Sequence, residues 1–135
     1  KLLVNSNSVL NTPPTLSIYV VNLVTNWMIE MGGIDYFQTK SEKQSKKIYD
    51  FIDENSDSMA CSVDEKQRSK SNIVFKFLND EYDREFIDLA KDVGIIGING
   101  HRSVGGIRVS LFNSVDDHMF NYFMDFFKNF ITERK

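Results

Sequence analysis

The chain has 135 residues, of which 41% are hydrophobic and 26% are charged, and its formal net charge is −3 at pH 7. This length fits a single domain with a real hydrophobic core, and the composition is ordinary for a globular protein. The small negative charge excludes a globally basic surface for nucleic acid.

Cysteine and histidine content and hydropathy exclude further classes of protein. Cys61 is the one cysteine of the chain, so no internal disulfide framework exists, and two distant histidines do not predict a zinc site. The most apolar run, residues 16–24, is too short to span a bilayer, and no signal-peptide pattern opens the chain. We therefore expect a cytoplasmic protein. Because the chain starts at Lys1 rather than Met, we also expect a piece of a longer protein.

A helix is predicted over residues 14–31. Thr12 followed by Pro13 is typical of a capped helix start, and Gly32 with Gly33 ends the pattern. Apolar residues cover most of the helix circumference, which is typical of a helix that is buried on more than one side. In so short a chain this predicts packing against a partner surface that the 135 residues do not supply.

The next helix, predicted over residues 34–54, has a different pattern. Its apolar stripe is thin, and lysines fill a polar face with charge pairs at i,i+4 spacing. This is typical of a surface helix whose lysines are solvated, which we favour over a binding patch.

The second half of the chain alternates strands and helices. Asp80 is predicted to cap one helix, and Asn99-Gly100 is a strong turn signal. We predict a short strand over residues 59–63, a strand over 72–78, a helix over 81–93, a buried strand over 95–98, a strand over 107–112 and a helix over 115–133. This order indicates an α+β fold with a mostly antiparallel sheet, covered by helices on one face.

The candidate binding segment is GHRSVGGIR at residues 100–108. It places His101, Arg102 and Arg108 among three glycines, and no acidic residue lies between Asp92 and Asp116. Glycine lets backbone approach a ligand, and the arginine fork matches carboxylate and phosphate. Strand alternation turns Arg108 away from its apolar neighbours. The segment therefore predicts a site for a small anion, although a surface salt bridge and an ordinary loop histidine are the plainer readings.

Two segments carry a family resemblance. NTPPT at residues 11–15, which leads into the predicted helix, and GHRSVGGIR at residues 100–108 both resemble motifs of phosphoserine aminotransferases. The likeness extends from about residue 5 to the end and corresponds to the final third of the family. It implies the small C-terminal domain of a fold-type I pyridoxal-phosphate enzyme, the fold of aspartate aminotransferase. Residues 1–13 would end the large cofactor-binding domain, residues 14–33 would form a long buried connecting helix, and residues 34–135 would form the small α+β domain.

The resemblance also implies a function. The family works as a homodimer that shares its cofactor site across the interface. It transfers an amino group between glutamate and 3-phosphohydroxypyruvate, which gives phosphoserine and 2-oxoglutarate. The lysine that carries the cofactor belongs to the missing upstream part, so no catalytic residue is expected in this chain and the fragment alone should be inactive.

Residue roles follow from matching positions. Arg108 matches the arginine that binds the substrate α-carboxylate, and His101 with Arg102 matches the pair that binds the distal phosphate or carboxylate. Asn11 and Thr12 match residues that reach the cofactor phosphate, although a plain helix cap is the simpler reading of Thr12. The alternatives are a non-catalytic anion-binding module, or another aminotransferase or desulfurase of the same fold.

Overall fold

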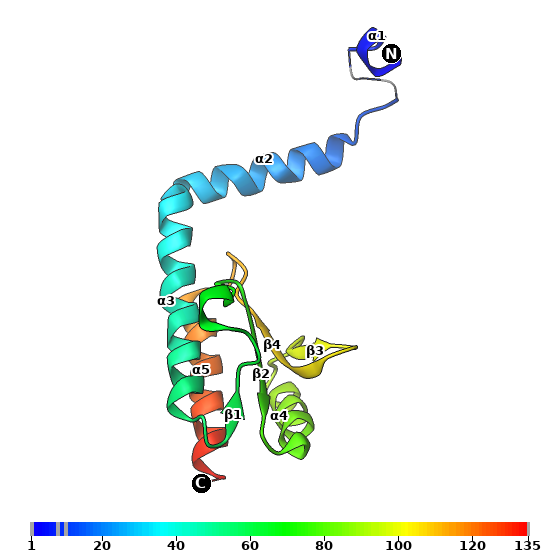
Figure 1. Ribbon diagram of the computed structural model, residues 1–135. Helices are drawn as coiled ribbons and strands as arrows, with labels where there is room; N and C mark the ends of the chain where they lie inside the picture. The colour runs from blue at the N-terminus through cyan, green and yellow to red at the C-terminus, as the bar shows by residue number, and fades with distance from the viewer. Residues whose placement is uncertain (1, 8, 10, 135) are drawn as a thin grey trace. The chain divides into compact units, whose positions relative to one another are not determined.

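The computed structural model describes residues 2–7, 9 and 11–134 (Figure 1). The chain divides into two compact units, Lys1–Phe37 and Gln38–Lys135. Helix α3 (Gly33–Glu54) begins in the first unit and continues through the second. Among the helices of the described residues, none combines the length and the hydropathy that a membrane span needs.

The first unit contains α1 (Leu2–Asn5) and α2 (Thr15–Glu30). The predicted helix over residues 14–31 is confirmed to within one residue at each end. After α2, Gly32 and Gly33 have φ angles of +112° and +69°, which glycine adopts readily. The helix therefore ends where the sequence predicts, and the rings of Trp27 and Phe37 meet beyond the turn with centroids 5.3 Å apart.

Helix α2 exposes its apolar residues in this chain. None of its residues is buried, and the exposed fractions of Leu16 and Ile29 are 74% and 67%. The predicted burial of this helix requires a surface beyond the chain, so it stays a prediction. The predicted cap is wrong: Pro14, not Thr12, occupies the N-cap position, and no side chain caps the helix.

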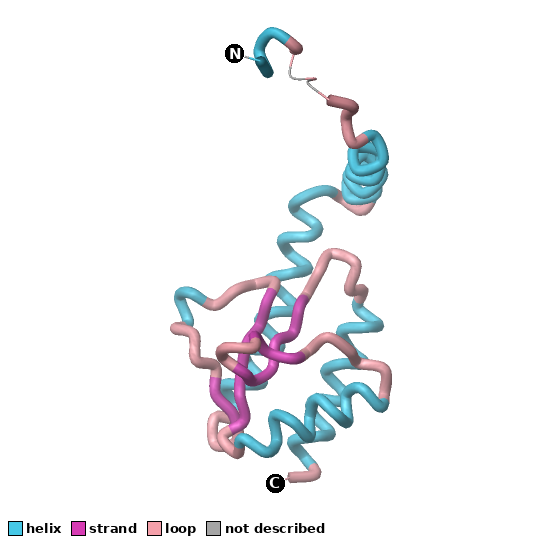
Figure 2. Tube along the Cα trace, turned by 90° about the vertical axis from the view of Figure 1, so that its right-hand side faces the viewer, coloured by secondary structure: helices cyan, strands magenta, loops and turns pink. Residues whose placement is uncertain are grey.

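The second unit is built on a four-stranded sheet with the order β1-β2-β4-β3. The strands are β1 (Met59–Ala60), β2 (Asn72–Phe77), β3 (Asn99–His101) and β4 (Gly105–Ser110). Each of the three neighbouring pairs is antiparallel, as predicted. In Figure 2 the longer strands lie side by side, with helices behind and below them.

One face of the sheet carries the core. Ile73, Phe75 and Phe77 of β2 are buried, and so are Ile107 and Val109 of β4. Helices supply the opposing aromatic layer. Phe127 stacks on Phe75 with centroids 4.9 Å apart, and Phe86 lies 4.9 Å from Phe130. The core is thus largely aromatic. It forms because alternate residues of the strands and helically spaced residues of the helices direct their apolar side chains inward.

The helices that follow the sheet strands are capped locally. Helix α4 (Asp80–Asp92) is capped by Asn79, whose side chain accepts a hydrogen bond from the Glu81 N–H, so the prediction that Asp80 is the cap is wrong by one residue. Helix α5 (Asp117–Thr132) is capped by Asp116, which accepts from the Met119 N–H at 2.8 Å.

Two predictions around residues 95–100 are wrong. Residues 95–98 form no strand, because Gly94 and Gly97 have φ angles of +83° and +78° and break the extended chain. Asn99-Gly100 is not a turn either. Both residues belong to β3, and the turn is formed by residues 102–104.

Candidate functional site

An open groove of about 1120 Å³ lies in the second unit, between α4 and the β3–β4 hairpin. Its lining comprises Asp80, Asp83, Arg84, Ile87, Asp88, Gly97, Asn99, Gly100, His101, Arg102, Gly105, Gly106 and Arg108. The structure thus brings together His101, Arg102 and Arg108, the three residues that the sequence singled out.

Glycines shape the hairpin that forms one wall. A Cβ atom on Gly100 would lie 1.9 Å from the Gly105 carbonyl oxygen, which is far inside van der Waals contact. Gly106 has φ +75°, and a Cβ there would lie 2.7 Å from the Phe75 carbonyl oxygen. The strands can approach this closely only without side chains at these positions. The sequence predicted a turn at Asn99-Gly100. Gly100 is instead required because the two strands pack too closely for a side chain at this position.

Arg108 lies on the open face of the sheet, which we define as the face opposite the core. Its neighbours Ile107 and Val109 are buried, whereas Arg108 is exposed and paired with Val74 of β2. The predicted direction of Arg108 is confirmed. Its guanidinium forms no ion pair with any residue that the structure describes, so the surface salt bridge considered from sequence is not observed.

His101 and Arg102 lie where β3 passes into the turn, and both are exposed. The Val104 N–H donates to the His101 carbonyl oxygen at 2.9 Å and closes this turn. His101 Nδ1 lies 3.3 Å from the Ser103 N–H and 2.8 Å from the Ser103 hydroxyl. Because a backbone N–H can only donate, Nδ1 accepts, and this geometry fits the neutral ring with its proton on Nε2. In that form His101 offers an anion one N–H donor.

Carboxylates form the opposite wall, which the sequence analysis did not foresee. Asp80, Asp83 and Asp88 of α4 line the groove together with three arginines. With His101 neutral, the formal charges of these six side chains balance. No acidic residue lies near these cations along the chain, but α4 brings to the groove acids that are distant in sequence. Helical spacing at i, i+3 and i+8 could have shown that they share one face.

Asp83 is the most constrained of these carboxylates. Its Oδ1 accepts a hydrogen bond from the Phe77 N–H at 2.9 Å, which ties the start of α4 to the end of β2. Burial raises the pKa of the Asp83 carboxyl, while the Phe77 N–H and the Lys76 charge act in the opposite direction. Sequence reasoning also missed Lys76, whose strand position places it on the open face with Arg108.

Asn11 and Thr12 belong to the first unit, whereas the groove belongs to the second. Both are exposed and lie in the irregular segment before α2. Neither forms a hydrogen bond with a described residue, so an amide and a hydroxyl remain available there. Among the described residues, no cluster of His, Cys, Asp and Glu has the arrangement of a metal site.

Comparison with known protein families identifies the family of this chain. Residues 4–119 match the model of the aminotransferase class-V family. The chain belongs to this family. A phosphoserine aminotransferase of Dichelobacter nodosus is 40% identical over 126 residues, and one of Bacillus subtilis is 36% identical over 132 residues. These alignments cover 93% and 98% of the chain but 35% and 37% of the relatives, so the chain spans about a third of their length.

Solved structures agree. A phosphoserine aminotransferase from Bacillus circulans subsp. alkalophilus is 37% identical, with a TM-score of 0.91 over 98% of this chain and 37% of its own. A pyridoxal-phosphate-bound phosphoserine aminotransferase from Trichomonas vaginalis is 27% identical, with a TM-score of 0.83 over 93% of this chain and 36% of its own. The fold is therefore shared with these enzymes over about a third of their length.

Proposed function

We propose that the chain is the C-terminal part of a phosphoserine aminotransferase. The parent enzyme transfers an amino group between glutamate and 3-phosphohydroxypyruvate, which gives phosphoserine and 2-oxoglutarate. The observation that carries this proposal is the groove that gathers His101, Arg102 and Arg108 on a fold shared with such enzymes. The 135 residues by themselves are expected to be inactive, because we assign no catalytic group to them.

Arg108 is the residue that we assign to the substrate α-carboxylate. It projects from the middle of β4, a strand held on both sides, so its Cα is rigidly placed. A guanidinium without a protein carboxylate partner among the described residues can offer its two-pronged donor set to a ligand. Holding the α-carboxylate this way fixes the orientation of the substrate Cα, which contributes to catalysis by positioning.

His101 and Arg102 are assigned to the distal anion of the substrate. Glutamate carries a carboxylate there and phosphoserine a phosphate, and one pocket must accept both because the half-reactions alternate. The exposed Nε2–H of His101 and the Arg102 fork at a hairpin turn supply donors of two kinds. A turn can also shift to suit anions of different size, unlike the strand that carries Arg108.

The residues present fit a phosphate-bearing cofactor in one respect. Asn11 and Thr12 offer an exposed amide and hydroxyl, which are suitable donors for the cofactor phosphate. When bound, pyridoxal phosphate supplies the electron sink that stabilises negative charge at the substrate Cα. We assign residues 1–13 to the end of the large cofactor domain, residues 14–33 to a connecting helix buried in the full enzyme, and residues 34–135 to the small domain.

The exposed apolar surface of α2 supports the burial of this helix in a larger assembly. We propose that this assembly is a homodimer that shares the cofactor site across its interface. We place the enzyme in the cytoplasm, which the single free thiol of Cys61 supports.

Arg108→Ala in the full-length enzyme loaded with pyridoxal phosphate tests the proposal. We expect transamination to fall by about a thousandfold or more, as expected when a positioning contact is lost, while the absorption spectrum of the bound cofactor stays normal. Arg108→Lys, which keeps the charge but loses the fork, should recover only part of the activity. Normal turnover in Arg108→Ala would contradict the assignment. A wild-type enzyme that does not use phosphoserine would favour a non-catalytic anion-binding module or another aminotransferase.

A further inference from the structure

Lys76 lies on the open face of the sheet beside the groove. In β2 the buried residues Phe75 and Phe77 flank it, so its side chain projects from the same face as Arg108. The register pairs Val74 with Arg108 and Phe75 with Ile107, which sets Lys76 opposite Gly106. On its other side Lys76 pairs with Ala60 of β1. Both cross-strand neighbours are therefore small.

The absence of a side chain at Gly106 makes room for the lysine stem. A Cβ atom on Gly106 would lie 2.6 Å from Cγ and 3.3 Å from Cε of Lys76, so the stem crosses the strand directly over this glycine. The Lys76 Nζ lies 3.9 Å from the Cβ position of Gly105. Gly105 is paired with His101. The stem therefore carries the ammonium group across β4 to the base of the hairpin turn.

The positive charge of Lys76 matters because of the charge balance in the neighbouring groove. Three aspartates offset the three arginines of the groove lining, so the lining by itself offers no excess positive charge to a dianion. The Lys76 ammonium forms no hydrogen bond or ion pair with any residue in the described part of the chain. Asp83 is the carboxylate close enough for Lys76 to lower its pKa, although burial outweighs this effect. The ammonium thus lies at the end of a flexible stem, close to Gly105, the residue that pairs with His101.

We propose that Lys76 determines specificity at this site by binding the distal phosphate of phosphorylated substrates. This inference rests on the proposed function. Glutamate presents one negative charge at the distal position, which His101 and Arg102 can satisfy. A phosphate monoester carries close to two negative charges and three acceptor oxygens, so it needs a further donor. A mobile lysine can reach the phosphate and withdraw when the smaller carboxylate is bound.

The test uses the full-length enzyme and measures the two half-reactions separately. Lys76→Gln keeps most of the stem over Gly106 but removes the charge. We expect kcat/KM for phosphoserine to fall about tenfold, as for the loss of one hydrogen bond to a charged group. The value for glutamate should change by less than about twofold on the same scale. Inhibition by inorganic phosphate should weaken in parallel, and Lys76→Arg should restore both.

The matched control is Lys66→Gln, which removes the same charge from an exposed lysine that, unlike Lys76, is not among the nearest neighbours of the groove glycines Gly105 and Gly106. It should leave both half-reactions unchanged. Equal losses for phosphoserine and glutamate in Lys76→Gln, or no loss for either, would overturn the role of Lys76. Because the glutamate half-reaction reports on folding, a misfolded variant cannot imitate the expected result. If the wild-type enzyme does not use phosphoserine at all, the proposed function fails first, and this inference fails with it.

Discussion

Gly100 and Gly105 are in direct backbone contact across the β3–β4 hairpin. A Cβ on Gly100 would lie 1.9 Å from the Gly105 carbonyl oxygen, which belongs to the backbone of the paired strand β4. Neither strand can move aside without breaking the pairing that positions His101 and Arg108. The hairpin therefore depends on glycine at this position for steric rather than conformational reasons.

Gly100→Ala should disrupt this hairpin. We expect a loss of stability of at least about 2 kcal/mol, because overpacking against backbone has no low-energy escape, together with loss of phosphate inhibition in the full-length enzyme. Thermal unfolding and amide hydrogen exchange of residues 99–108 would measure this. Gly94→Ala is the control: it has φ +83° but open space around the new Cβ, so its cost should be only the left-handed penalty of about 1 kcal/mol. Equal effects of the two variants would contradict the steric argument.

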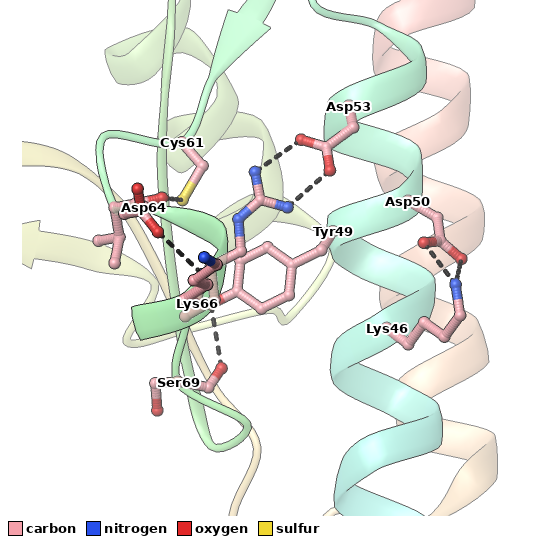
Figure 3. Close-up of polar contacts among 10 residues, drawn as sticks. Lys46, Tyr49, Asp50, Asp53, Cys61, Asp64, Lys66 and Ser69 are labelled. Atoms are coloured by element: carbon pink, nitrogen blue, oxygen red, sulfur yellow. Dashed lines mark hydrogen bonds and ion pairs between the residues drawn. The ribbon is translucent and has the colours of Figure 1, made fainter.

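The ion pair between Arg68 and Asp53 should stabilise the fold at neutral pH and lose this effect in acid (Figure 3). Arg68 Nη1 and Nη2 donate to the two oxygens of Asp53 at 2.6 and 2.8 Å, and its guanidinium lies 4.8 Å from the centre of the Tyr49 ring. This hydrogen bonding to Arg68 lowers the pKa of Asp53 from its ordinary 3.8. The folded state therefore favours the ionised carboxylate, and the gain is present above about pH 4 and lost as the pH falls through the lowered pKa.

We expect Asp53→Asn to cost about 1 kcal/mol or less at pH 7, because the carboxylate is half exposed and screened by solvent. The difference from wild type should shrink toward zero as the pH falls below about 4. Denaturant unfolding between pH 3 and pH 7 measures it. Asp50→Asn, which breaks the more exposed Lys46–Asp50 pair, is the control and should cost less. A difference that stays constant with pH would refute the role of the ionised pair.

Asp83 should show the opposite pH dependence. Because burial raises its pKa above the ordinary 3.8, the folded state binds this proton more tightly than the unfolded state. Asp83 therefore favours folding at low pH, and this contribution is lost as the pH rises through the raised pKa. Asn at this position keeps an oxygen that can accept from the Phe77 N–H but cannot ionise.

Asp83→Asn should thus gain stability relative to wild type as the pH rises from about 3 to 7. It should also strengthen inhibition by inorganic phosphate, since a carboxylate near Lys76 has been removed from the groove. The measurement is a titration of enzyme activity with inorganic phosphate. Asp80→Asn is the comparison, because it removes another groove carboxylate and so distinguishes the effect of the position of Asp83 from a general loss of negative charge. If phosphate inhibition were unchanged in Asp83→Asn, the acidic wall would not oppose anion binding.

Sequence reasoning succeeded where the relevant interactions are local. Alternation of Ile107, Arg108 and Val109 gave the direction of the arginine because successive side chains of any strand point to opposite faces. Helical periodicity gave α2 and α3 to within one residue, since their apolar spacing and the glycine stop between them are properties of the chain itself. The errors at Thr12 and Asp80 are small, because several adjacent residues can each cap a helix.

Local sequence patterns could not predict which other residues surround the site. Asp80, Asp83 and Asp88 precede the hairpin by more than ten residues, and only the packing of α4 against β2 and β4 brings them to the groove. Lys76 likewise becomes a neighbour of the hairpin through the pairing of β2 with β4. Pairing partners are set by the whole core, which no single segment encodes.

The sequence by itself therefore determined the α+β class, the exposed direction of Arg108 and the presence of His101 and Arg102 in one short segment. Only the tertiary structure decided the charge of the groove, because electrostatic balance depends on distances between side chains that lie far apart along the chain. It also decided why Gly100 must be glycine: the nearest atom belongs to the opposite strand, and steric contact between strands exists only once they pair.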